Sequence, residues 1–236
     1  MAYTAMALLV VIGMVTVLLI GEPRRGSAEA LDANGFATDS ALARAAAAIR
    51  RTERAALHGP LLLLVLLLLA AEPIARRFTD DPIHVIGIGQ GSGRGFHGSS
   101  DLTTFEATRH AAQEAYAMAG LAPRDIQFAE VHDCFSIAEL IHIEDLGFFK
   151  PGEGYKAVSD GQTRLDGPKP INTSGGLKSK GHPVGATGVA QLYEVWLQLR
   201  GRAGKRQIPN RNLRVGGAHN LGGTGGTCTF TILERR

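Results

Sequence analysis

The segment IQFAEVHDCFSIAELIHIEDL, residues 126–146, decides the predicted fold. Its first part, Ile126 to Val131, is a short run bounded by polar residues that favours a buried strand. Ser136 to Leu146 follow a helical pattern and stop at Gly147, a residue typical of helix ends. A strand that passes through a four-residue polar loop into a helix is characteristic of a layered α/β domain.

The same alternation continues on both sides of this segment, with glycine or proline between the elements. Further strands are expected at Ile83–Ile88, Leu213–Ala218 and Thr227–Leu233. Further helices are expected at Leu102–Ala119, before Gly120, and at Pro183–Arg200, before Gly201. Because the glycine-rich stretch Gly222–Gly226 separates the last two strands, we expect them to pair as a hairpin.

The first 71 residues differ from the rest in composition, so we place a domain boundary near residue 72 and divide the chain into 1–71 and 72–236. Residues 2–20 are apolar and long enough to cross a bilayer as a helix, with a buried core helix as the alternative. Arg24 and Arg25 follow this run and favour a cytoplasmic C-terminal side. We therefore expect a cytoplasmic protein with a possible N-terminal membrane anchor.

Charge and cysteine content exclude several classes of protein. The formal net charge is +3, and the basic residues are scattered rather than gathered in one block. This mild excess suits anionic ligands but does not indicate nucleic-acid binding. The chain has two cysteines, Cys134 and Cys228, so a disulfide scaffold is disfavoured and each cysteine is judged as a thiol.

Three polar clusters stand where strands or glycine turns meet loops, and such positions often carry active sites. The first is His132 to Phe135, between the predicted strand and helix. The second is the glycine- and serine-rich loop from Asn172 to Pro183, which leads into a predicted helix. The third, His219 to Gly226, is the predicted hairpin turn.

Residue chemistry suggests roles for the first cluster. Cys134 lies near a helix N-terminus and near histidines, which can lower a thiol pKa and create an acid/base group or a nucleophile. A zinc site is disfavoured because CxxC and HxxxH spacings are absent, so we expect no metal. His132 could equally be a structural histidine at a strand end.

The other two clusters allow a functional and a structural interpretation. His182 stands between a glycine and a proline, where its imidazole could orient a thiolate or donate to an enolate oxygen. It could also simply cap a helix. The glycines after His219 can aim several amide groups at one point and form an oxyanion hole, but an ordinary tight hairpin would also use glycines.

In this order, the three clusters resemble the motifs of thiolases, most closely those of the sterol-carrier-protein type. His132–Phe135 resembles the His-Asp-Cys-Phe loop of that group, and Gly181–Pro183 resembles its Gly-His-Pro motif. His219–Gly222 is similar to the segment that replaces the C-terminal Cys-x-Gly motif. The resemblance covers about residues 62 to 236. It implies a thiolase-like C-terminal domain in which a mixed central sheet carries helices on both faces.

The resemblance also implies acyl transfer through a cysteine thioester, by thiolysis of a 3-oxoacyl-CoA or by the reverse Claisen condensation. Coenzyme A and acyl-CoA would be substrates, with no covalently bound cofactor. His182 would activate the nucleophile and, with a water held by His132, would bind the thioester oxygen, while Cys134 would move the α-proton. The remaining implied site residues are His219, Gly222 and Gly223 at a second oxyanion hole, and Ser174, Gly175 and Gly176 in a substrate loop.

One departure from the family pattern concerns the nucleophile. In thiolases the nucleophilic cysteine lies in the N-terminal half of a duplicated fold, but no cysteine precedes Cys134 in this sequence. We therefore expect the chain to need a thiolase N-terminal half as partner, or to associate with copies of itself. The alternatives are a non-catalytic protein that binds acyl-CoA or a partner, and a truncated gene product.

Overall fold

The computed structural model describes residues 75–76, 79–95, 97–99, 101–209 and 212–236. The chain divides into two compact units, and the second, Thr79–Arg236, contains nearly all of these residues. The predicted membrane segment at 2–20, the rest of the extension at 1–71 and the boundary near 72 lie outside the described residues. Among the helices that are described, none combines the length and the apolar character needed to cross a membrane.

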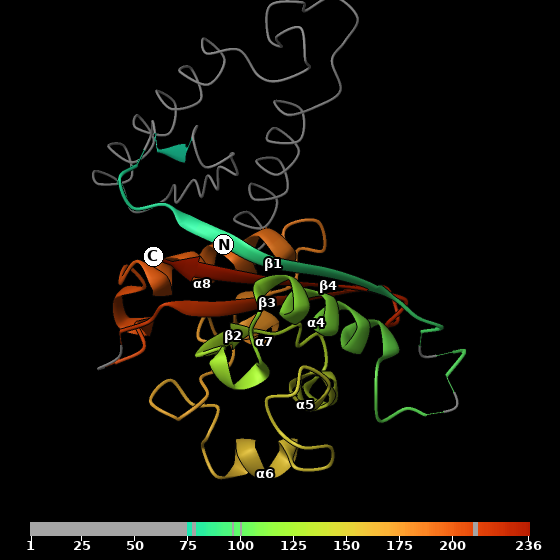
Figure 1. Ribbon diagram of the computed structural model, residues 1–236. Coiled ribbons are helices and arrows are strands. Elements are labelled where there is room, and N and C mark those ends of the chain that lie inside the picture. Colours follow the sequence, from blue (N-terminus) through green and yellow to red (C-terminus); the bar gives the residue numbers. More distant parts are fainter. Residues whose placement is uncertain (1–74, 77–78, 96, 100, 210–211) are drawn as a thin grey trace, which may run out of the picture. The chain divides into compact units, whose positions relative to one another are not determined.

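Four strands form one mixed sheet in the order β1-β4-β3-β2, shown in Figure 1. The strands are β1 (Ile83–Ser92), β2 (Phe128–Glu130), β3 (Val215–Gly222) and β4 (Thr227–Arg235). Strand β4 runs antiparallel to both β1 and β3, whereas β2 runs parallel to β3. The predicted hairpin is confirmed, because β3 and β4 pair directly up to Gly222 and Thr227.

Helices cover both faces of the sheet, so the predicted α/β class is confirmed. Helix α4 (Glu106–Ala119) packs on β1 and β4, and α8 (Thr187–Leu199) packs mainly on β3 and β2. The alternation along β4 shows that these are opposite faces, because Ile232 joins the cluster under α4 while Leu233 joins the one under α8. The shorter helices are α5 (Ser136–Asp145), α6 (Gly154–Ser159) and α7 (Gly176–Lys180), and two 3-10 turns lie at Pro123–Asp125 and Gly204–Arg206.

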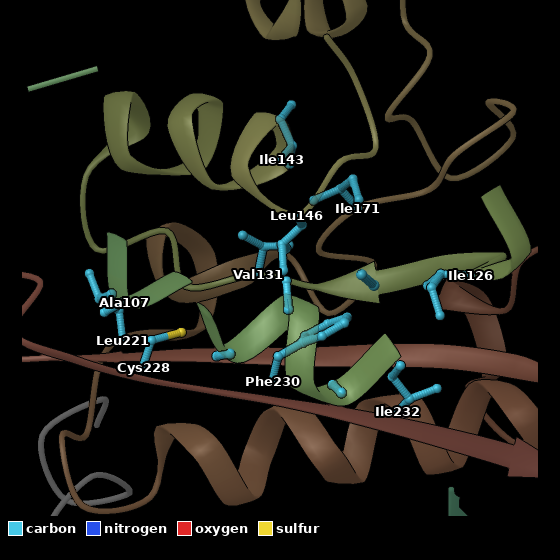
Figure 2. Packing of buried hydrophobic residues seen from close by; sticks show 14 residues of the cluster. Ala107, Ile126, Val131, Ile143, Leu146, Ile171, Leu221, Cys228, Phe230 and Ile232 are labelled. Atoms are coloured by element: carbon cyan, nitrogen blue, oxygen red, sulfur yellow. The ribbon is translucent and has the colours of Figure 1, made fainter. Parts of the chain in front are cut away.

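The larger core cluster lies between the sheet and the α4–α5 layer (Figure 2). Phe230 and Ile232 of β4 point into it and meet Ile126 and Val131, which flank β2. Cys228 is buried in the same cluster, and burial raises the pKa of its thiol to about 12. Cys228 is therefore a packing residue of the core.

Helix α4 approaches β1 closely because neither element has large side chains at the contact. Every second residue of the strand is a glycine, and every fourth residue of the helix face is an alanine; the set is Gly87, Gly89, Gly91, Ala107, Ala111 and Ala115. A Cβ atom at Gly89 would overlap the carbonyl oxygen of Ala111. Two residues of strand and four of helix span about the same length, roughly 6 to 7 Å, so the two patterns stay in register.

Several element boundaries differ from the sequence prediction, and three of them concern the elements around the histidines. Helix α4 begins at Glu106 rather than at 102, since the Asp145 carboxylate accepts hydrogen bonds from the residues just before it. Helix α8 begins at Thr187 rather than at Pro183, whose carbonyl closes a turn instead. Strand β3 continues to Gly222, so His219 lies in a strand and not in the hairpin turn.

Candidate active site

The parallel pairing of β2 with β3 brings His132 beside His219. Glu130 at the end of β2 lies opposite Ala218 of β3, so the residues that follow these two positions run side by side. Both histidines are buried, and the backbone N–H of His132 donates to Nδ1 of His219 at 3.3 Å. Two of the predicted site residues, 87 positions apart in the chain, are therefore in direct contact.

The loop between 172 and 183 adds His182 to the same place. Its ring centroid lies 5.0 Å from that of His132, with the two rings at 80°. The Thr187 hydroxyl donates to the Pro183 carbonyl at 3.1 Å, so it must accept a proton from Nδ1 of His182, which lies 2.7 Å away. Nε2 of His182 therefore carries the lone pair and can accept a proton.

His132 has the opposite proton arrangement. The Asn220 side-chain amide donates to Nδ1 of His132 at 3.4 Å and to Oε1 of Gln191 at 2.9 Å. Gln191 is fixed in turn by its bond to the His219 carbonyl at 2.8 Å. Nδ1 of His132 is therefore the acceptor, and Nε2 carries the proton. The two neighbouring imidazoles thus offer one donor and one acceptor.

Burial keeps His132 neutral. The pKa of His132 is lowered to about 4, mainly by burial and then by the nearby His182. The charge of Asp133 raises the pKa by a smaller amount. At neutral pH the Nε2–H group is thus a hydrogen-bond donor without a full charge. Sequence reasoning missed Gln191, which sits on α8 with no motif to mark it.

Cys134 lies two residues beyond His132 and is half-buried. Burial raises its pKa, an effect larger than the opposing effects of the local amide groups and of Lys178. The predicted lowering of this pKa was wrong. Burial disfavours the thiolate more than the amide groups at the start of α5 stabilise it. Near neutral pH the side chain is therefore a thiol, which suits a proton donor more than a resting nucleophile.

Asp133 ties the Cys134 loop to the glycine-rich loop. Its carboxylate accepts the backbone N–H groups of Leu177 at 2.7 Å and Lys178 at 3.5 Å, in the first turn of α7. Gly176 lies against this carboxylate with a φ of 63°, and a Cβ atom there would collide with it. Gly175 has a φ of 91°. Gly176 is needed for this close approach, and Gly175 for the left-handed backbone that precedes α7.

Glu130, at the end of β2, binds the same loop at Ser174. It is fully buried and accepts the Ser174 N–H at 3.0 Å and the Ser174 hydroxyl. Lys180 lies 3.4 Å from the carboxylate and partly offsets burial, which raises the pKa of Glu130. Ser174, Gly175 and Gly176, predicted as a substrate loop, thus make contacts that fix the loop, and contact with substrate stays a prediction.

His219 lies in the core, whereas Gly222 and Gly223 lie where β3 meets the hairpin turn. His219 is fully buried, and Nε2 of its ring lies 3.1 Å from the Thr108 hydroxyl, so both ring nitrogens have partners inside the protein. Gly222 ends β3, and Gly223 begins the turn with a φ of 60°. His219 therefore contacts His132 from the core, while the predicted catalytic role of His219 and the oxyanion role of the two glycines stay predictions.

Comparison with protein families agrees with this geometry. Residues 90–235 match the family described as thiolase C-terminal domain-like. The chain belongs to this family. The matched segment includes β2, the His132 loop, the 172–183 loop and the β3–β4 hairpin, so every predicted site residue of the thiolase domain lies within it.

The relatives of the thiolase domain include proteins named acetyl-CoA acetyltransferase and sterol carrier protein 2. The chain is 50% identical over 169 residues to an acetyl-CoA acetyltransferase of Methanothermobacter thermautotrophicus, covering 71% of this chain and 44% of that protein. It is 48% identical over 133 residues to human sterol carrier protein 2, covering 56% and 24%. The chain thus spans less than half the length of these relatives.

A solved structure with a similar fold is the Ltp2-ChsH2(DUF35) aldolase. The TM-score is 0.62 at 27% sequence identity, and the match covers 75% of this chain and 48% of that chain. The thiolase-like fold is therefore shared with an enzyme named for a different reaction.

Two other kinds of site are of interest in the described part of the thiolase domain, namely a metal-ligand cluster and a surface hollow. Among these residues, no group of three or more His, Cys, Asp or Glu side chains could hold a metal ion. A shallow surface hollow lies between the loop after β1 and the start of α4, and Gly225 also lines it. It contains none of the candidate catalytic residues.

A third buried histidine among the described residues, His142 of α5, was missed by sequence reasoning because it occupies an ordinary helix position. Burial, with a smaller contribution from His132, lowers its pKa to about 3, well below the value of roughly 6.5 expected in an unfolded chain. Between about pH 4 and 6 the unfolded chain binds this proton and the folded chain does not. The free energy of unfolding is therefore unaffected by this group above about pH 6.5, and it decreases as the pH falls toward 3.

We predict that His142→Leu makes the thiolase domain less sensitive to acid. Removing one titrating group should lower the slope of unfolding free energy against pH by about 1.4 kcal/mol per pH unit between pH 4 and 6. Urea unfolding of parent and variant at several pH values measures this slope, and other titrating groups cancel in the difference. Equal slopes for the two proteins would show that His142 is not a buried neutral group.

Proposed function

We propose that this chain supplies the acid/base and oxyanion-binding groups of a thiolase-type acyl-CoA acyltransferase. The observation that carries the proposal is the His132–His182 pair, in which one imidazole offers an N–H and the other a lone pair at a ring separation of 5.0 Å. A donor next to an acceptor is the arrangement that enolate chemistry needs.

The proposed chemistry assigns each group a separate task. Cys134, as thiolate, removes the α-proton of a bound acyl-CoA, and the negative charge moves to the thioester oxygen. A water held by Nε2–H of His132 stabilises that oxygen, and His182 adds a second donor once its Nε2 has accepted the proton of the nucleophilic thiol.

In condensation the enolate carbon attacks the acyl thioester on the nucleophilic cysteine, the new C–C bond forms, and the cysteine leaves as a thiolate. In thiolysis the nucleophilic cysteine attacks the 3-oxo carbon and the Cα–Cβ bond breaks, which leaves the enolate. The Cys134 thiol then protonates the enolate carbon, and CoA removes the acyl group from the cysteine. His182 accepts the proton of the nucleophilic thiol.

Acyl-CoA is the proposed substrate, without a covalently bound cofactor. The support is the family match and the relatives named acetyl-CoA acetyltransferase. The nucleophilic cysteine is proposed to come from a thiolase N-terminal half, since the chain covers 44% of the Methanothermobacter relative.

The similarity to an aldolase favours a second candidate, carbon–carbon cleavage of a 3-hydroxyacyl-CoA. In that reaction a base removes the hydroxyl proton, the Cα–Cβ bond breaks, and the electrons pass to the thioester oxygen. The same two imidazoles could act as base and donor, and no cysteine nucleophile is needed.

Isotope exchange tests the proposal directly. The full chain is incubated with acetyl-CoA in D2O, alone and with a thiolase N-terminal half, and deuterium in the acetyl group is measured by mass spectrometry. We expect exchange at least about 100-fold above background, the usual contribution of a positioned acid/base group. A background rate in both samples would contradict the proposal.

Two further substrates separate the candidate reactions. Thiolysis of acetoacetyl-CoA should require free CoA and the N-terminal half. Cleavage of a 3-hydroxyacyl-CoA should require neither, and would favour the aldolase alternative. Saturable binding of acetyl-CoA without any turnover would instead support a non-catalytic binding protein.

A further inference from the structure

A chain of hydrogen bonds runs from the His132 backbone into the core. His132 N–H donates to Nδ1 of His219 at 3.3 Å, and Nε2 of His219 lies 3.1 Å from the Thr108 hydroxyl. That hydroxyl lies 3.3 Å from Nδ1 of His142. The three inner residues come from β3, α4 and α5, and each is fully buried.

The backbone donor determines the direction of the first two bonds in this chain. A backbone N–H can only donate, so Nδ1 of His219 must carry a lone pair and its Nε2 must carry the proton. The Thr108 hydroxyl oxygen therefore accepts the His219 proton. The same oxygen lies within hydrogen-bond distance of Nδ1 of His142.

The inner end of the chain has a feature that packing does not explain. Nε2 of His142 is buried and has no hydrogen-bond partner among the described residues. The ring lies between His219, at a centroid distance of 4.4 Å, and Phe105, at 4.8 Å. A leucine would fill this apolar position without an unsatisfied ring nitrogen, so the polar contact of this imidazole with the site is made through Nδ1.

We propose that Thr108, with His142 behind it, is a positioning residue that holds the His219 ring in the one orientation able to accept the His132 N–H. This holds His132 in the candidate site, and so the inference rests on the proposed function. The two residues lie outside the three motifs, on helices that carry no other candidate site residue.

The experiment compares Thr108→Val, which keeps the shape but removes the hydroxyl, with Thr108→Ser, which keeps the hydroxyl. Hydrogen exchange of the His132 amide is measured by NMR in the full chain. In Thr108→Val we expect its protection to fall about tenfold, the effect of weakening one hydrogen bond to a buried acceptor. The amides of Phe230 and Ile232 should keep their protection, and Thr108→Ser should behave as the parent.

The α-proton exchange rate of acetyl-CoA gives a second, separate measurement. It should fall in Thr108→Val and recover in Thr108→Ser. Equal loss of protection at His132 and in β4 would mean that Thr108 only stabilises the fold, and unchanged His132 protection would also overturn the inference. If the His132 amide responds as expected while the parent shows no isotope exchange, the positioning geometry stands and the proposed function fails.

Discussion

Replacing Cys134 by alanine should lower the rate of acetyl-CoA α-proton exchange by about a thousandfold, measured in D2O with the thiolase N-terminal half present. The variant loses the only side chain assigned to carry the α-proton, and a positioned acid/base group contributes roughly 100- to 10,000-fold. The loss should appear in the catalytic rate rather than in acetyl-CoA binding. Isothermal titration of acetyl-CoA measures binding separately.

The pH dependence of the parent provides an independent check of the same assignment. Burial raises the pKa of Cys134, so little thiolate is present at pH 7. The exchange rate should therefore rise about tenfold per pH unit from pH 7 to 8, in proportion to the thiolate. Cys228→Ala and Ser136→Ala should retain the parent rate and its pH profile. Exchange by Cys134→Ala at the parent rate would exclude the thiol as the acid/base group.

Replacing Gly89 by valine should destabilise the domain by more than about 3 kcal/mol, the upper part of the range for overpacked cores. The added Cβ atom would overlap the Ala111 carbonyl oxygen, and a backbone atom in the middle of α4 cannot move aside by a change of rotamer. The helix must shift from the strand, which opens the alanine–glycine contact along its length.

The matched control for this prediction is Ile88→Val, one residue earlier in β1. Ile88 points away from α4 and is 48% exposed, so the substitution should change stability by less than about 0.5 kcal/mol. Urea unfolding of both variants followed by circular dichroism provides the comparison. Similar midpoints for Gly89→Val and Ile88→Val would mean that α4 does not lie against β1 as described.

Sequence patterns predicted the elements of this domain better than their ends. Short apolar runs and glycine stops located β2, α5 and the β3–β4 hairpin. They failed at the start of α8, because Thr187 and Pro183 form a turn through contacts that a periodic pattern does not record. They also placed His219 in a turn, since the glycines that follow it resemble a loop although β3 continues to Gly222.

The sequence by itself determined the fold class and the family, because strand and helix periodicity and three ordered motifs are local properties of the chain. Only the tertiary structure decided which nitrogen of each imidazole carries the proton, that His219 supports His132 from the core, and that burial raises the Cys134 pKa. Each of these depends on partners and solvent exclusion contributed by residues distant in sequence, such as Thr108, Gln191 and Asn220. Proton positions and pKa values follow from that surrounding environment, which spacing along a chain does not encode.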